Sequence, residues 1–218
     1  MNTRHSVIDF GFATVTRVAA FTVLLVLLAI IFSLLLGSLP ALVNFGTEFL
    51  WTEAWDPVQE EFGAAGPVYG TLVTSAIAMI VAVPVSFGIA LFITELCPRV
   101  LRRTLGIAIE LLAAIPSIIY GMWGLFVFAP WFSANIQPWL IEHVGGIPMI
   151  GALFEGAPLG IGMFTAGLVL SIMVIPFIAA VMRDVFEVVP PVLKESSYAM
   201  GATTWEVMRS IVLPYTKA

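Results

Sequence analysis

The chain has 218 residues, of which 60% are apolar and only 11% are charged, with a formal net charge of −5. Soluble domains are about half apolar and a quarter charged, so this composition argues against a soluble domain. The negative net charge argues against a nucleic-acid-binding surface, and a single cysteine, Cys97, excludes a disulfide within the chain.

Four long blocks of sequence hold the apolar excess and contain almost no charge: 18–39, 69–94, 105–130 and 160–182. A helix of about 22 residues is about 33 Å long, enough to cross a hydrocarbon core of about 30 Å. Because a helix satisfies its own backbone groups in lipid, we predict an all-α polytopic membrane protein with four spans. Pro84, Pro116 and Pro176 lie inside three blocks and are expected to kink the helices.

Positive charge is distributed on one side of these predicted spans only. The nine cations are Arg4 and Arg17 before the first block, Arg99, Arg102 and Arg103 between the second and third, and Arg183, Lys194, Arg209 and Lys217 after the fourth. Cytoplasmic loops of membrane proteins carry an excess of Lys and Arg. We therefore predict that 1–17, 95–104 and 183–218 are cytoplasmic and that 40–68 and 131–159 are external.

The segment after Met182 is expected to form two short helices joined by a tight turn. Pro191 suits the first position of a helix, and Gly201 suits the left-handed position just after its end. Thr203 and Glu206 have the spacing of a capping box that begins a second helix, which Pro214 is expected to interrupt. Such a pair would form a compact knob that transmits force, although an ordinary amphipathic connector between spans has the same pattern.

The same segment resembles the cytoplasmic signature of binding-protein-dependent ABC importer permeases: Glu-Ala-Ala, three residues, Gly, nine residues, Ile-x-Leu-Pro. This chain has Glu195-Ser196-Ser197, Gly201 and Ile211-Val212-Leu213-Pro214 at the same spacing, with two serines in place of the alanines. In that family the segment is the coupling helix that docks on the ATPase subunit. The resemblance implies this role for Glu195, Ser196, Ser197, Gly201, Ala202, Thr203, Ile211, Leu213 and Pro214.

Two further stretches, 66–75 and 114–124, resemble permeases of the phosphate importer, and the long loop 40–68 resembles the PstC-type subunit more than its PstA-type partner. The resemblance implies a type I ABC importer permease bundle of six spans. The chain ends just after the coupling signature, so four of six spans are expected, without the family's Gly-Arg-Ala-x-Gly-Glu stretch. A fragment, a truncated gene product or an incomplete record of a longer chain would each explain this.

The resemblance also implies partners: a second, PstA-type permease, two PstB-type ATPase subunits, an external PstS-type phosphate-binding protein, and membrane lipid. The sequence has no Gly-Lys-Ser or Gly-Lys-Thr, as a phosphate-cradling Walker A loop requires. We therefore expect ATP to be used by a partner and no cofactor to be bound by this chain. No metal-ligand spacing and no nucleophile–base constellation is visible, so no metal site and no catalytic residue are expected.

Polar residues inside the spans are the candidates for a translocation path. Glu110 lies about 9 Å into the third span; it either serves a path or is a structural carboxylate bonded to a neighbouring helix. Pro116 frees backbone groups beside the hydroxyls of Ser117 and Tyr120. Hydroxyls of the second span could contribute too, although small hydroxyls more often mediate helix packing. These are Thr71, Thr74 and Ser75.

Three alternatives to a phosphate importer permease remain open. An importer permease for sulfate or molybdate would differ only in the transported oxyanion. A secondary transporter or channel would not depend on an ATPase partner. A membrane anchor without a transport role is the third.

Overall fold

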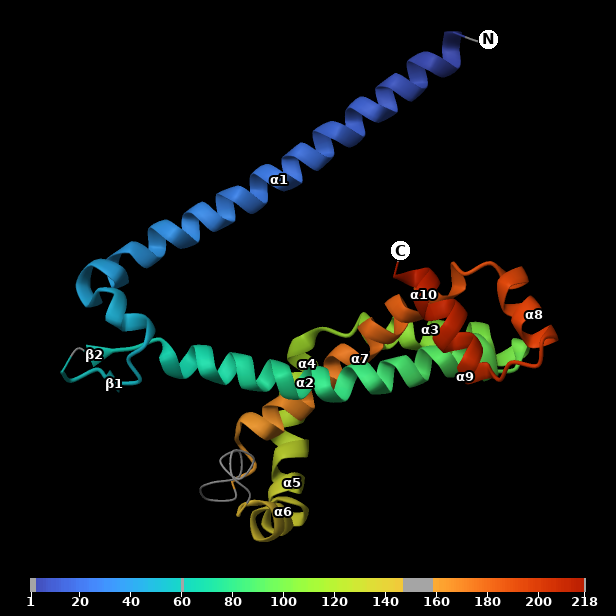
Figure 1. The fold of residues 1–218 in the computed structure, drawn as a ribbon. Helices are drawn as coiled ribbons and strands as arrows, with labels where there is room; N and C mark the ends of the chain where they lie inside the picture. Colours follow the sequence, from blue (N-terminus) through green and yellow to red (C-terminus); the bar gives the residue numbers. More distant parts are fainter. Residues whose placement is uncertain (1–2, 60, 147–158, 218) are drawn as a thin grey trace. The chain divides into compact units, whose positions relative to one another are not determined.

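The computed structural model describes residues 3–59, 61–146 and 159–217, and most of them are helical (Figure 1). In this described part of the chain, four helices are long and apolar enough to cross a membrane: Asp9–Phe45, Ala65–Leu96, Ser117–Asn135 and Met163–Glu187. The prediction of an all-α polytopic membrane protein is therefore confirmed. The chain divides into two compact units, Met1–Val68 and Tyr69–Ala218, which are described separately.

The first unit consists of one long helix and a small aromatic cluster. Helix α1 (Thr3–Phe45) is followed by the 3₁₀ turn η1 (Thr47–Leu50) and by an antiparallel pair of two-residue strands, β1 (Trp55–Asp56) and β2 (Glu61–Phe62). The Phe62 ring packs edge-on against Phe45 at 5.7 Å and Trp55 at 5.1 Å. Large apolar side chains of α1 are exposed from Phe10 to Val43, as expected of a helix whose surroundings are lipid.

The second unit is built around helices α2 (Ala65–Leu91) and α7 (Met163–Glu187). A face of small residues spaced four apart is buried on α2: Ala78, Ala82, Ser86 and Ala90. The Ser86 hydroxyl donates to the Ile175 carbonyl of α7 at 3.0 Å. Gly167 of α7 lies so close to Ile77 that an added Cβ would come within 2.7 Å of its side chain. Small residues thus allow these helices to approach closely, as in other membrane bundles.

Prolines affect these helices in different ways. Pro84 and Pro176 lie inside α2 and α7 without ending either helix. Pro116, by contrast, divides the third predicted span, because its extended backbone (φ −55°, ψ 133°) separates α3 (Arg99–Ala113) from α4 (Ser117–Trp123). The π turn η3 (Gly124–Phe128) and α5 (Ala129–Asn135) continue from α4, and α6 (Gln137–Val144) follows in the segment predicted as an external loop.

The expectation that Pro214 interrupts the second tail helix is wrong. Helix α9 (Thr204–Val207), the π turn η5 (Met208–Val212) and α10 (Leu213–Thr216) form one helical run through this proline. In η5 the Leu213 N–H bonds the Met208 carbonyl five residues back. This wider turn lets the chain pass a residue that lacks an N–H and would otherwise clash with the preceding turn. The same arrangement precedes Pro130, where the Ala129 N–H bonds the Gly124 carbonyl.

Candidate coupling knob and membrane cavity

Helices α8 (Pro191–Ala199), α9 and α10, together with the turn between α8 and α9, form the knob, residues Pro191–Thr216. Pro191 is the first residue of α8, as predicted. Gly201 has φ 87° and follows the C-cap residue Met200, which confirms its left-handed position. The Gly201 N–H bonds the Tyr198 carbonyl at 2.9 Å and the Ala202 N–H bonds the Ser197 carbonyl at 3.2 Å. These two bonds are the Schellman motif that ends a helix at a glycine.

The second helical run of the knob begins with the predicted capping box. The Glu206 N–H donates to the Thr203 hydroxyl at 3.4 Å, and the Thr203 N–H donates back to Glu206 Oε2 at 2.7 Å. Because this backbone N–H stabilises the ionised carboxylate, the pKa of Glu206 lies below its ordinary value. A carboxyl with a lowered folded-state pKa stabilises the fold above its unfolded pKa and loses that effect as pH falls through the folded pKa.

We therefore expect the start of α9 to loosen when the pH falls into the acidic range, and Glu206→Ala to reproduce this loosening at neutral pH. The cause is the loss of the acceptor for the Thr203 N–H, one of the donors that a helix start leaves unpaired. Hydrogen–deuterium exchange of the α9 amides would measure it. Glu195→Ala is the matched control, because Glu195 is an exposed carboxylate of the knob outside the capping box; unchanged exchange in Glu206→Ala would contradict the assignment.

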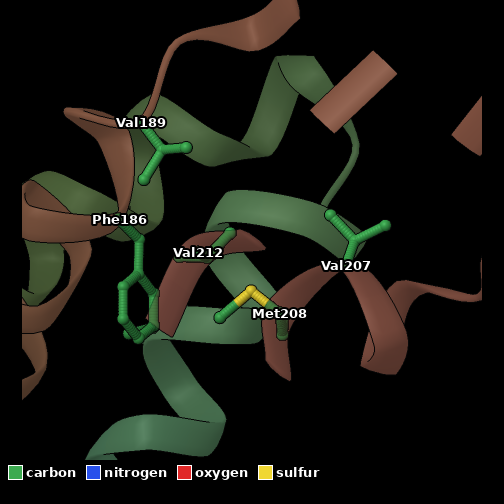
Figure 2. Close-up of a cluster of buried hydrophobic side chains, with 6 residues drawn as sticks. Phe186, Val189, Val207, Met208 and Val212 are labelled. Atoms are coloured by element: carbon green, nitrogen blue, oxygen red, sulfur yellow. The ribbon is translucent and has the colours of Figure 1, made fainter. Parts of the chain in front are cut away.

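A buried apolar cluster holds the knob against the ends of two spans (Figure 2). Val207, Met208 and Val212 of the knob pack with Phe186 at the end of α7 and with Val189. Ala90 of α2 completes the cluster, and three of the residues with an implied coupling role lie partly buried against it: Ala202, Ile211 and Leu213. The apolar part of the signature therefore attaches the knob to α2 and α7.

A largely buried ion pair joins α8 to the same two helices. Lys194 Nζ lies 2.8 Å from Glu95 Oε1, in the π turn η2 (Phe92–Leu96) that ends α2, and it also donates to the Phe186 carbonyl at 3.1 Å. The Tyr198 hydroxyl donates to the other Glu95 oxygen at 3.3 Å. Only 15% of the Lys194 side chain and 7% of the Glu95 side chain are exposed. Sequence reasoning did not identify Glu95; its signal was a carboxylate placed directly after a long apolar block.

The outer surface of the knob combines charge with exposed apolar side chains. Glu195 and Ser196 are exposed, as are Val192 and Met200, the latter with 89% of its surface accessible. Ser197 is half-buried and Pro214 is exposed. A body fixed to two spans and presenting such a surface can bind a partner and pass its movement to the membrane helices.

A cavity of about 310 Å³ lies beside the break at Pro116. Ser117 and Tyr120 line it, together with Gly124 and with Thr165 and Val169 of α7. The Tyr120 hydroxyl donates to the Leu112 carbonyl at 3.1 Å, which is the carbonyl that a helical N–H at Pro116 would have bonded. Thr165, which is buried, was not among the predicted residues.

The other predicted path residues do not line this cavity. The Thr74 hydroxyl donates to the Gly70 carbonyl of its own helix at 2.8 Å, and Ser75 is exposed. Thr71 is likewise absent from the cavity lining. Glu110 pairs with Arg183 of α7 at 2.7 Å, as the structural alternative for this carboxylate predicts. The structure thus brings Ser117 and Tyr120 together at the cavity beside Pro116. The other candidates do not line that cavity: Thr71, Thr74, Ser75 and Glu110.

Four candidate spans, and a knob that packs against the ends of α2 and α7, define a multi-pass membrane protein with a compact helical attachment. Among the described residues, no group of three His, Cys, Asp or Glu side chains could hold a metal ion. The family profile "Binding-protein-dependent transport system inner membrane component" matches residues 82–217, which include the knob. The chain belongs to this family.

Curated relatives that match nearly the whole chain are phosphate transport system permease proteins PstC. The protein from Pasteurella multocida (strain Pm70) is 61% identical over 98% of this chain and 67% of its own length. Those from Haemophilus influenzae and Mesorhizobium japonicum are 57% and 54% identical over 96% and 98% of this chain and 67% and 65% of their own lengths. The chain thus spans about two thirds of the length of these relatives. No solved structure was found to match the chain.

Proposed function

We propose that this chain is the transmembrane permease subunit of an ATP-driven importer for inorganic phosphate and that it is not itself an enzyme. The observation that carries the proposal is the 54–61% identity, over nearly the whole chain, to permeases of phosphate transport systems. The knob supports it, because Gly201 of the importer signature makes its Schellman turn, and Ile211, Val212 and Leu213 of the signature lie in or against its apolar cluster.

The proposed assembly pairs this chain with a second, homologous PstA-type permease to enclose the path. Two PstB-type ATPase subunits bind and hydrolyse ATP, and one of them docks on the knob through the surface that includes Glu195. An external PstS-type binding protein delivers phosphate. Closure of the ATPases moves the knob, and the attachments of the knob to α2 and α7 transmit that movement to the spans. This chain binds no cofactor of its own.

The substrate path is proposed to run past the break at Pro116, where Ser117 and Tyr120 line a cavity. The cavity is nearly apolar, so positive charge to offset an anion would come from other helices or from a partner. Thr71, Thr74, Ser75 and Glu110 stay predictions for the path in the assembled importer.

We propose that the chain lies in the inner membrane with its N-terminus and knob in the cytoplasm; the distribution of its nine cations supports this orientation. Cysteines introduced at Trp51 or Trp139, both exposed, should react with an impermeant thiol reagent in intact cells, in a Cys97→Ser background. Met200→Cys, in the knob, should react only after the cells are opened. Labelling of the knob in intact cells, with the loops protected, would reverse the orientation.

Phosphate uptake tests the proposed substrate. Cells in which the gene for this permease is deleted should lose high-affinity, ATP-dependent uptake of inorganic phosphate and recover it when the gene is restored. Loss of sulfate or molybdate uptake with unchanged phosphate uptake would assign another oxyanion to the same permease. Unchanged uptake of all three would contradict the proposal.

A further inference from the structure

A second cavity, of about 490 Å³, lies along the polar face of α3, away from the cavity at Pro116. Arg99, Arg102, Arg103, Gly106 and Glu110 of α3 line it; these positions fall on one face of a helix. Arg183 and Glu187 of α7 contribute from the other side. We call this the arginine pocket.

The charges in the arginine pocket are not balanced. Arg183 is committed to carboxylates, since its Nη2 lies 2.7 Å from both Glu110 Oε1 and Asp184 Oδ1. Gly106 permits this position of Arg183, because an added Cβ would lie 2.5 Å from the Arg183 Nη1. Once Arg183 and Glu110 are paired, the charges left in the lining are the three arginines of α3 and one carboxylate, that of Glu187.

The three arginines have no carboxylate partner in the part of the chain that the structure describes, where ion pairs involve Arg183 and Lys194. The Nε of Arg102 is moreover buried without a hydrogen-bond partner among the described residues. Buried donors are nearly always paired in native structures, so we expect the Arg102 side chain to shift and expose this donor when an acceptor enters the pocket. A guanidinium binds oxyanions through its planar fork of donors, and phosphate is an oxyanion that this geometry fits.

The apolar face of α3 indicates the depth in the membrane at which α3 and its arginines lie. Val100, Leu101 and Leu111 are exposed, Val100 with 87% of its surface accessible. A helix with one basic face and one exposed apolar face lies at the boundary between lipid headgroups and acyl chains. Basic clusters beside a span on the cytoplasmic side attract anionic headgroups.

We propose that the arginine pocket binds a phosphate group through Arg99, Arg102 and Arg103. Two sources share this chemistry: the headgroup of an anionic phospholipid in the cytoplasmic leaflet, and free inorganic phosphate on the same side. The pocket is distinct from the knob and from the cavity at Pro116. The proposal rests on the membrane placement of the chain and does not depend on which substrate the importer carries.

The test uses the purified chain in nanodiscs of phosphatidylcholine. One arm adds phosphatidylglycerol to the nanodiscs and counts bound lipid by native mass spectrometry; the other titrates inorganic phosphate and measures binding by calorimetry. The variant Arg102→Gln/Arg103→Gln should weaken binding by about tenfold or more, because each arginine removed loses charge-assisted hydrogen bonds. Arg209→Gln removes an exposed arginine of the knob and should leave binding unchanged.

The variant Arg102→Lys/Arg103→Lys keeps the charge but not the planar fork and should bind with intermediate affinity. Its binding also verifies that substitutions in this face leave α3 folded. Binding of phosphatidylglycerol without inorganic phosphate would support the proposal with lipid as the source, and the converse would support it with free phosphate. Binding of neither probe, or equal binding by the wild type and the Gln variant, would overturn it.

Discussion

Breaking the largely buried Lys194–Glu95 pair should cost up to about 3–5 kcal/mol, the range for a fully buried pair, in the free energy that holds the knob on the membrane helices. We expect this for either Lys194→Met or Glu95→Gln, because each leaves the other member of the pair in a site where little of it reaches solvent. Glu95→Gln also weakens the acceptor of the Tyr198 hydroxyl. Both variants should insert in the membrane, since Lys194 lies outside the candidate spans and Glu95→Gln only removes a charge at the end of the span Ala65–Leu96.

A double-mutant cycle isolates the pair from its surroundings. Lys194→Met/Glu95→Gln should cost clearly less than the sum of the two single variants, because no unpaired charge then remains buried. Hydrogen–deuterium exchange of the α8 amides measures the loss, and phosphate uptake by the assembled importer measures its consequence. Arg209→Met, an exposed cation of the knob, is the control and should change neither. Additive costs would show that the pair does not hold the knob.

The second large effect is expected at the turn between α8 and α9. Gly201→Val should destabilise the turn by about 1–2 kcal/mol, the cost of forcing a residue with a Cβ into a left-handed conformation, because Gly201 has φ 87°. An added Cβ would meet no atom within 4 Å, so the cost is conformational and not a steric clash. The α8 Schellman bonds should weaken, and uptake should fall while the spans remain folded.

Two controls separate backbone conformation from side-chain size. Gly201→Asn should retain most of the stability and uptake, because asparagine adopts the left-handed region more readily than valine. Gly88→Ala, in α2, also adds a Cβ where no atom lies within 4 Å, and should be neutral or stabilising. Equal uptake by the Gly201→Val and wild-type proteins would contradict a need for this turn.

Local features of the knob could be predicted because each is decided within a few residues. Pro191 at a helix start, Gly201 after a helix end and the Thr203–Glu206 box follow from which backbone groups lack a helical partner there. The number of four spans could be predicted for a similar reason, since length and apolar composition suffice to identify candidates, although the third candidate begins at Ser117 and not at 105.

Features that depend on contacts between distant segments could not be predicted. Lys194 and Glu95 are 99 residues apart in the chain, and neither neighbourhood indicates the other. The pairing of Glu110 with Arg183 spans 73 residues and was only one of two alternatives. Pro214 was misjudged because a π turn, which the sequence does not indicate, lets the helix continue. Thr165 lines the cavity because of the way α7 packs, and the helical periodicity of the sequence alone does not determine that packing.

The central claim is that the knob is the docking surface of an importer permease. Co-purification of the ATPase subunit with the Glu195→Arg variant tests this claim most directly. Glu195 is exposed, so reversing its charge should leave the knob folded, with α8 exchange unchanged. Asp9→Arg, an exposed carboxylate on the same predicted side of the membrane but outside the knob, is the control. The account predicts that Glu195→Arg loses ATPase association and phosphate uptake while Asp9→Arg retains both. Normal ATPase association and normal uptake in Glu195→Arg would contradict it and would leave the knob as a connector between spans.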